Sequence, residues 1–416
     1  MLQEGLPRHV WAVMGCTWLI AFAMLGRILC LPPLAHIIKE TLFLTHGKIG
    51  LIFSLPLAIL AATAIPSGLL GDRIGPRIAV GIGAIIMTAG SFATGTATNF
   101  LSLFVFTCIF GIGFSMVYTS LPTLMALWFS KEKAGLATGV YVTGIGIGAA
   151  VSLGITLPVV FPITNSFRGT LFIWSIPVLV ATILWWIVVK DPPASSSPIE
   201  SRQIGERGKG SYVVWGNKSL WLVALCFFCL SFQFYTWVGW TPKLMMLKGA
   251  TPELAAFMIS WMQWISIPFM FLMPWAAHRI GLTKPFLWVS AVVAALLSFI
   301  AIYMPLPLGW FVMAILGITQ GTLPLLLALP VELMPEESAA TATGMVLSIG
   351  VSGSLAGPWL AGHILDATGT LDMALVVVTG AAIAMAIFAF LLPETGSQAR
   401  PRPSYDASLK RSLETK

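Results

Sequence analysis

The chain has 416 residues, of which 57% are hydrophobic and only 9% are charged, and its mean hydropathy is +0.90. This composition excludes a water-soluble globular protein and predicts a chain whose solvent is the lipid bilayer. The net charge of +7 is not accompanied by a basic, aromatic patch, so the sequence gives no support to a nucleic-acid partner.

Twelve apolar stretches are long enough to cross a membrane, since a hydrocarbon core of about 30 Å takes roughly 20 residues of helix. They predict an all-α protein with spans at 10–35, 48–70, 77–96, 99–128, 135–160, 168–189, 219–246, 252–276, 285–304, 308–331, 341–364 and 372–393. The first stretch is too long for a removable signal peptide and lacks a small-residue cleavage site, so we expect it to be a membrane helix.

Basic residues predict the orientation, because loops rich in Lys and Arg stay on the cytoplasmic side. With both termini inside, the inner loops and tails hold 17 of the 23 basic residues, the outer loops hold five, and Arg27 lies within the first span. We therefore expect a multi-pass protein of the cytoplasmic (inner) membrane with both termini in the cytoplasm.

A polar segment rich in Pro, Ser and Gly, residues 191–217, separates the first six spans from the last six. It predicts a cytoplasmic linker between an N-terminal six-helix bundle at 1–190 and a C-terminal bundle at 218–395, followed by a cytoplasmic tail at 396–416.

Two short motifs recur about 205 residues apart and indicate an internal repeat. The stretch Gly68-Leu-Leu-Gly-Asp72-Arg73-Ile-Gly75-Pro-Arg77 returns in part as His278-Arg279-Ile280-Gly281, and Ala137-Thr138-Gly139 returns as Ala342-Thr343-Gly344. Two pseudo-symmetric six-helix bundles in parallel orientation are the expected outcome.

The doubled arrangement and the loop between the second and third spans resemble the major facilitator superfamily. The residues that match its loop motif are Gly68, Asp72, Arg73, Gly75 and Arg77. The resemblance implies that the Asp contacts neighbouring helices in the outward-open state and acts as a conformational latch. A plain basic inner loop is the alternative.

Shorter matches in the second half resemble the cyanate and 2-nitroimidazole permease branch of that family. They lie in Phe234-Tyr235-Thr-Trp237-Val-Gly-Trp240-Thr-Pro242, Ile267-Pro268, Gly317-Ile-Thr-Gln320-Gly321 and Gly357-Pro358-Trp-Leu-Ala-Gly362-His363-Ile-Leu-Asp366. This resemblance implies a permease for small solutes.

Arg27 is the one charge that we expect within the membrane, since all 16 Asp and Glu residues fall in loops, tails or helix ends. It lies roughly 17 residues, or about 25 Å of helix rise, into the first span. A guanidinium there costs about 2.5–3.5 kcal/mol and keeps its proton, so we expect it to face a wet cavity and bind an oxyanion or carboxylate. The alternative is a structural role, in which it reaches the headgroups or caps carbonyl groups of a neighbouring helix.

Polar and aromatic residues of other spans are candidates for the same solute site, although plain packing is the alternative for any single aromatic. The predicted solute-binding residues, besides Arg27, are Tyr118, Tyr141, Gln233, Tyr235, Trp237, Gln263, Gln320 and His363. Gln233, Trp237 and Trp240 are spaced to share one helix face.

The eleventh span carries Gly353, Gly357 and Pro358 in a spacing that resembles a pattern of the fifth helix of drug-proton antiporters. The fifth span here has Ser152-Leu153 where that pattern has Gly-Pro, so the antiporter function does not transfer. We expect the eleventh helix to pack closely and to bend as a gate, and close packing without motion is the alternative.

Nothing in the sequence predicts a metal, a cofactor, an ATP site or catalysis. The five cysteines fall within apolar spans, where Cys226 and Cys229 lack the charged setting of a zinc or redox site. His363 with Asp366 has no accompanying nucleophile motif, which argues against a membrane enzyme.

These observations predict a secondary transporter, acting as a monomer, that moves a cyanate-, nitrate- or carboxylate-like anion or small polar organic solute by alternating access. A coupling proton is a further possible partner. The alternative within the class is an exporter of neutral or nitroaromatic compounds. A non-transporting membrane sensor would usually carry a soluble signalling domain, and no sufficiently long stretch outside the spans is present.

Overall fold

The computed structural model describes residues 8–128, 131–190, 215–334 and 336–395. Within these ranges, the side chains of residues 8, 9, 65, 72, 126, 131–139 and 336–341 lie outside the description. The described residues form helices and connecting turns without a strand, and 12 of the helical segments are long and apolar enough to cross a membrane. The predicted all-α membrane fold is confirmed.

Six membrane segments form the N-terminal bundle. They are α1 (Arg8–Leu29) continued by α2 (Leu31–Leu42), α3 (His46–Ile74), α4 (Pro76–Gly95), α5 (Phe100–Trp128), α6 (Lys131–Ile155) continued by η1 (Thr156–Val160) and α7 (Phe161–Thr164), and α8 (Phe167–Val188).

Six further segments form the C-terminal bundle. They are α10 (Lys218–Leu247), α11 (Pro252–Ile280), α12 (Lys284–Tyr303), the broken segment η3 (Leu306–Leu308), α13 (Gly309–Thr319), η4 (Gln320–Thr322) and α14 (Leu323–Leu333), then α15 (Glu336–Thr368) and α16 (Asp372–Leu391).

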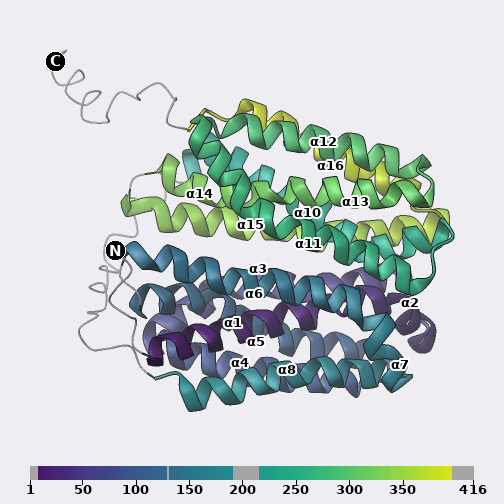
Figure 1. Ribbon diagram of the computed structural model, residues 1–416, viewed down its shortest axis with the longest axis horizontal. Coiled ribbons are helices and arrows are strands. Elements are labelled where there is room, and N and C mark those ends of the chain that lie inside the picture. The colour runs from purple at the N-terminus through teal and green to yellow at the C-terminus, as the bar shows by residue number, and fades with distance from the viewer. Residues whose placement is uncertain (1–7, 129–130, 191–214, 335, 396–416) are drawn as a thin grey trace.

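The two bundles lie side by side with their helices roughly parallel, and α1 begins and α16 ends at the same end of the molecule (Figure 1). We call this end, where α8 ends and α10 begins, the linker face. The opposite end, where α3 begins and α15 ends, is the distal face. The predicted linker and tail lie mostly outside the described residues, so their exact boundaries stay a prediction.

The first membrane segment is longer than the predicted 10–35, because a second helix continues it to Leu42. Pro32 and Pro33 stand in the first turn of α2, where a missing N–H leaves no hydrogen bond unmade. Lys39 was one of the five basic residues expected in outer loops, with Lys48, Arg168, Lys243 and Lys248, and it lies on this helix instead. His36 and Glu40 of the same helix pair one turn apart at 3.2 Å.

Glycines at equivalent positions end two helices and bear out the predicted repeat. Gly75 follows α3 with φ of 87°, and Gly281 follows α11 with φ of 76°. Glycine adopts positive φ without strain, so a glycine ends the corresponding helix in each bundle, although ψ differs, at 142° for Gly75 and 19° for Gly281.

Glycines also let neighbouring helices touch backbone to backbone. A Cβ on Gly113 of α5 would stand 2.3 Å from the amide nitrogen of Met87 and 2.4 Å from the carbonyl oxygen of Gly83, both on α4. Association of helices in lipid relies on such close van der Waals contact, because the surrounding lipid is as apolar as the helices.

We predict that Gly113→Val destabilises the N-terminal bundle by about 1–3 kcal/mol, since the added methyl groups must push α4 away. Thermal unfolding of the purified protein in detergent measures the effect. Gly380→Val is the matched control, because no atom lies within 4 Å of a Cβ built on Gly380 of α16. Equal melting temperatures for the two variants would contradict the close α4–α5 contact.

Candidate functional site

The two bundles touch through α3 and α15 between the middle of these helices and the distal face. A Cβ on Gly50 would stand 2.3 Å from the carbonyl oxygen of Pro358, and one on Gly362 would stand 2.5 Å from the carbonyl oxygen of His46. Trp240 of α10 adds a hydrogen bond from Nε1 to the carbonyl oxygen of Pro358, at 2.9 Å. The bundles are thus in backbone contact at this seam.

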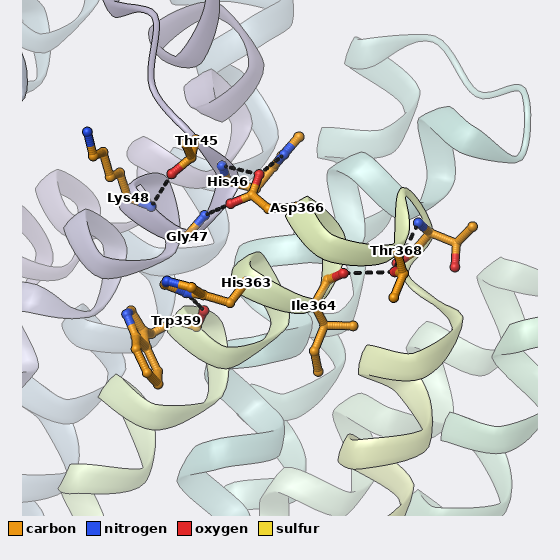
Figure 2. Close-up of polar contacts among 10 residues, drawn as sticks. Thr45, His46, Gly47, Lys48, Trp359, His363, Ile364, Asp366 and Thr368 are labelled. Carbon is orange, nitrogen blue, oxygen red and sulfur yellow. Dashed lines mark hydrogen bonds and ion pairs between the residues drawn. The ribbon is translucent and has the colours of Figure 1, made fainter.

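Asp366, at the distal end of α15, binds the first residues of α3 (Figure 2). Its carboxylate accepts hydrogen bonds from the backbone N–H groups of His46 at 2.9 Å and Gly47 at 2.8 Å, and Oδ1 lies 2.8 Å from Nδ1 of His46. The first N–H groups of a helix have no partner within it and carry partial positive charge, so a carboxylate is a favourable cap. We call these three residues the distal clasp.

A second seam joins the bundles through α6 and α11. The hydroxyl of Ser260 donates to the carbonyl oxygen of Ala150 at 2.7 Å, and a Cβ on Gly154 would stand 2.7 Å from that hydroxyl. Nearer the middle of the membrane, a Cβ on Gly146 would stand 3.0 Å from Ile267. The two seams together close the distal side of the space between the bundles.

The linker-face halves of α3 and α15 are not in the same close contact. Around Gly68 of α3 and Gly344 of α15, no atom of another described element lies within 4 Å of a built Cβ. Tyr118, in the linker-face half of α5, exposes 37% of its surface.

Three tyrosines from both bundles come together at this depth. Tyr118 on α5 lies close enough to Tyr141 on α6 and to Tyr235 on α10 for electrostatic interaction with each of them. The ring of Tyr118 also packs against Phe114, with centroids 5.6 Å apart. Of the predicted solute-binding residues, these three therefore lie near one another although they come from both bundles, and we call them the tyrosine cluster.

Gln263 faces the α6 seam from the other bundle. It lies three residues after Ser260 and four before Ile267, so it shares the face of α11 that contacts α6. Its side chain is only 4% exposed, yet its Oε1 has no hydrogen-bond partner among the described residues. A buried amide oxygen without a partner is costly and suits a position that a polar ligand visits.

Gln233, Trp237 and Gln320 point elsewhere. They line a small cavity of about 10 Å³ within the C-terminal bundle, and Nε2 of Gln233 donates to the carbonyl oxygen of Cys229 at 3.1 Å. Gln233 and Trp237 share a helix face, as expected. This face points into the C-terminal bundle, whereas Tyr235 lies on a different face of α10. Direct solute contact by these three residues stays a prediction.

Arg27 is 3% exposed and points into the N-terminal bundle. Its Nε donates to the hydroxyl of Ser91 at 2.8 Å, and its Nη2 donates to the hydroxyl of Thr94 and the carbonyl oxygen of Ser91. Within the described ranges it makes no ion pair. These contacts are those of the structural role that was the alternative to anion binding. For the guanidinium to bind an anion directly, Arg27 would have to break its hydrogen bonds with α4.

His363 lies where the start of α3 meets the end of α15, and we call this contact, together with the distal clasp, the distal gate. A Cβ on Gly47 would stand 2.5 Å from its ring, and its Nδ1 lies 3.0 Å from the carbonyl oxygen of Trp359 (Figure 2). Its position at the gate separates it from the tyrosine cluster. Asp366 contacts His46 rather than His363.

The predicted latch is described in part. The side chain of Asp72 lies outside the described residues, and Arg73 is exposed. Arg77 donates from Nε to the carbonyl oxygen of Val189 at 2.7 Å, and its guanidinium lies 6.0 Å from the ring centroid of Trp186. Arg77 therefore ties this loop to the end of α8, and the latch function of Asp72 stays a prediction.

Close packing of the predicted gating helix α15 is present on the side of α10 as well. A Cβ on Gly353 would stand 2.2 Å from the carbonyl oxygen of Phe228, and one on Gly357 would stand 2.3 Å from the hydroxyl of Thr236. The glycines of α15 thus allow close contact with α10, at Gly353 and Gly357, and with α3, at Gly362. Motion of α15 stays a prediction.

A family model described as the Major Facilitator Superfamily matches residues 16–358 and 249–413. The chain belongs to this family. It is 26% identical to the uncharacterized transporter YycB of Bacillus subtilis, over 90% of this chain and 91% of that protein. It is also 26% identical to the 2-nitroimidazole transporter of Escherichia coli, over 86% of this chain and 88% of that protein.

Among solved structures, a bacterial homolog of the human lysosomal transporter Spinster, in an inward-facing and occupied conformation, has a TM-score of 0.80. It is 15% identical, and the match covers 96% of this chain and all of that one. The predicted fold and the resemblance to this superfamily are confirmed, and the chain is a multi-pass membrane transporter.

Sequence reasoning missed the distal clasp and the seams. His46 and Asp366 are 320 residues apart, and neither lies in a motif that links them. One signal was present: Gly47 and Gly50 near the start of one span, and Pro358 and Gly362 near the end of another, are small or rigid residues at helical spacing. Such pairs mark faces where helices approach closely.

We predict that Asp366→Ala raises the amide exchange rates of His46 and Gly47 by roughly tenfold or more, because hydrogen bonds to charged groups contribute about 1.5–3 kcal/mol. Hydrogen–deuterium exchange of peptides at the start of α3 measures the change. Asp372→Ala is the matched control, since Asp372 begins α16 near the same face. Unchanged exchange in Asp366→Ala would contradict the clasp.

Proposed function

We propose that this protein carries a small anion of the carboxylate, nitrate or cyanate type across the cytoplasmic membrane by alternating access. The tyrosine cluster between the bundles is the observation that carries the proposal. Transporters of this architecture bind their solutes near the midplane, between the two repeats. The linker face is the cytoplasmic side in this proposal, as the distribution of basic residues predicts.

The chemistry of the cluster suits such a solute. Each phenol hydroxyl can donate one hydrogen bond to an anionic oxygen, and its ring offers an apolar face to an organic body. Since Tyr118 and Tyr141 come from one bundle and Tyr235 from the other, a solute held by all three would bridge the bundles. Gln263 would add an amide at the α6 seam.

Arg27 supports the preference for negative charge from a distance. Its Cζ lies 5.9 Å from the ring centroid of Phe110, and Phe110 precedes Tyr118 by two turns of α5, or about 12 Å of rise. At an effective dielectric constant of about 20, a unit charge roughly 12 Å away attracts an anion by about 1.4 kcal/mol. This corresponds to about tenfold in affinity.

The two seams provide the alternating step. In the arrangement described here, the distal side is closed by backbone contact of α3 with α15 and by the distal clasp. Opening that side requires both to separate, with a compensating approach of the helices at the linker face. A solute that binds one arrangement more tightly shifts the balance between them.

The hydroxyl groups of the cluster provide a direct test. Tyr118→Phe and Tyr235→Phe each remove one oxygen, and we expect each variant to bind benzoate about tenfold more weakly, because hydrogen bonds to charged groups contribute about 1.5–3 kcal/mol. Thermal-shift titration of the purified protein measures affinity, since a bound ligand raises apparent stability.

Tyr303→Phe is the matched control, because Tyr303 is 77% exposed at the distal end of α12. If benzoate, nitrate and cyanate all fail to stabilise the wild type, or if the cluster variants bind like this control, the solute class or the site is wrong.

Arg27 separates attraction at a distance from direct binding. We predict that Arg27→Met weakens benzoate binding about tenfold, following the estimate above, while binding of uncharged benzamide is unchanged. Arg27→Lys keeps the charge and should keep most of the affinity for benzoate. A loss of affinity as large as in Arg27→Met would indicate that the guanidinium of Arg27 binds the anion directly. Near-normal benzoate affinity in Arg27→Met would overturn the preference for anions.

A second candidate is transport of neutral or nitroaromatic compounds. The relative that carries 2-nitroimidazole favours it, and so do the aromatic faces of the tyrosine cluster. In this case Arg27 is purely structural. Stabilisation by benzamide and 2-nitroimidazole, without stabilisation by benzoate, would favour this function over the first.

A further inference from the structure

A cavity of about 30 Å³ lies at the distal face, between α2, α3 and α10. Its wall includes Pro33, His36 and Lys39 of α2, His46 of α3, and Trp240 and Lys243 of α10. Both bundles therefore contribute to the wall, with seven residues from the N-terminal bundle and five from the C-terminal bundle. The cavity exists in this form because the distal gate is closed.

The titratable side chains that line this cavity are all basic: His36, Lys39, His46 and Lys243. Two carboxylates lie nearby without lining it. Glu40 pairs with His36 at 3.2 Å, and Asp366 holds His46 within the distal clasp. Each histidine of the wall therefore pairs with a carboxylate, whereas among the described residues neither lysine does.

Lys39 and Lys243 face this space from opposite bundles. Both are half-buried, and both lie close enough to His46 to act on it electrostatically. Within the described part of the chain, neither ammonium group has a hydrogen-bond or ion-pair partner. Two like charges brought together by gate closure repel each other and favour opening, unless something negative lies between them.

We propose that this cavity binds a small monovalent inorganic anion, such as chloride, and that the bound anion holds the distal gate closed. The anion would bridge Lys39 of the N-terminal bundle and Lys243 of the C-terminal bundle. An anion that binds only the closed arrangement must favour it. This site is separate from the tyrosine cluster and does not depend on the identity of the transported solute.

The size of the cavity limits the ligand. A water molecule needs about 10–15 Å³ of space measured in this way, so 30 Å³ accepts one compact ion. Chloride fits this description, whereas gluconate carries the same charge on a much larger body. Comparing the two salts at equal ionic strength separates occupancy of the cavity from general screening.

The experiment titrates the purified full-length protein with sodium chloride against a sodium gluconate background and follows thermal unfolding. We expect chloride to raise the melting temperature of the wild type. In Lys39→Gln and Lys243→Gln, the chloride concentration for half of this effect should rise at least fivefold. Lys39→Arg and Lys243→Arg keep the charge and should respond like the wild type.

Lys48→Gln is the matched control, because Lys48 lies near the same face but packs over Phe100, at 5.2 Å from the ring centroid. Tyr118→Phe should also keep the chloride response, so that failure of the solute site is distinguishable from failure of this one. As a readout of the gate, chloride should slow amide exchange at His46 and Gly47 in the wild type, and it should not do so at the same concentration in Lys39→Gln or Lys243→Gln.

Several outcomes would overturn the proposal. An identical response to chloride and gluconate in the wild type would exclude a size-selective site. Equal responses in Lys39→Gln, Lys243→Gln and Lys48→Gln would exclude these lysines as ligands. Stabilisation by chloride without slower exchange at the start of α3 would show that the anion does not act on the gate.

Discussion

Helix α15 must lie against two helices of different bundles at backbone distance, and the rest of the arrangement depends on this constraint. Gly353 and Gly357 allow the contact with α10, while Pro358 and Gly362 meet α3. In lipid there is little hydrophobic drive between helices, so van der Waals contact at short range and interhelical hydrogen bonds supply the attraction. A side chain larger than hydrogen at Gly353 or Gly357 would push α15 away from α10, and one at Gly362 would separate the two bundles at the distal side.

Closure in turn sets the electrostatics. The distal clasp places a carboxylate on the partly positive start of α3, so the gate gains from charge as well as from contact. The same approach brings Lys39 and Lys243 to one cavity, which opposes closure. Within the N-terminal bundle, Arg27 donates to hydroxyl and carbonyl groups of α4, and among the described residues it pairs with no acid. Positive charge without a local counterion therefore occurs both at the distal mouth and close to the proposed solute site.

The sequence was sufficient for the fold because the bilayer imposes a simple rule. Each span must be apolar and about 20 residues long, and the predicted spans recover all the membrane helices of the described chain. Errors arose where a polar helix continues beyond the apolar core, as α2 does at Lys39. The repeat could be recognised because Gly75 and Gly281 end corresponding helices with positive φ, which few residues other than glycine adopt.

The candidate site was harder to predict, because hydropathy places a residue in depth but not around the helix axis. Tyr235 and Gln233 are two positions apart on α10, yet one faces the other bundle and one faces its own. Arg27 lies at the expected depth, but the hydroxyls of Ser91 and Thr94, which no motif marks, decide where it points. Helix rotation depends on packing across the whole bundle, and a single sequence carries little information on it.

Asp366 recognises mostly main chain, and this has a consequence for evolution. Two of its three contacts are with the backbone N–H groups of residues 46 and 47, which most residue types would present in the same place. Position 46 is therefore free to drift while the carboxylate retains its two amide partners. Among homologues, the acid would be preserved without a covarying partner, so methods that infer contacts from correlated substitutions would overlook the very interaction that joins the two bundles at this face.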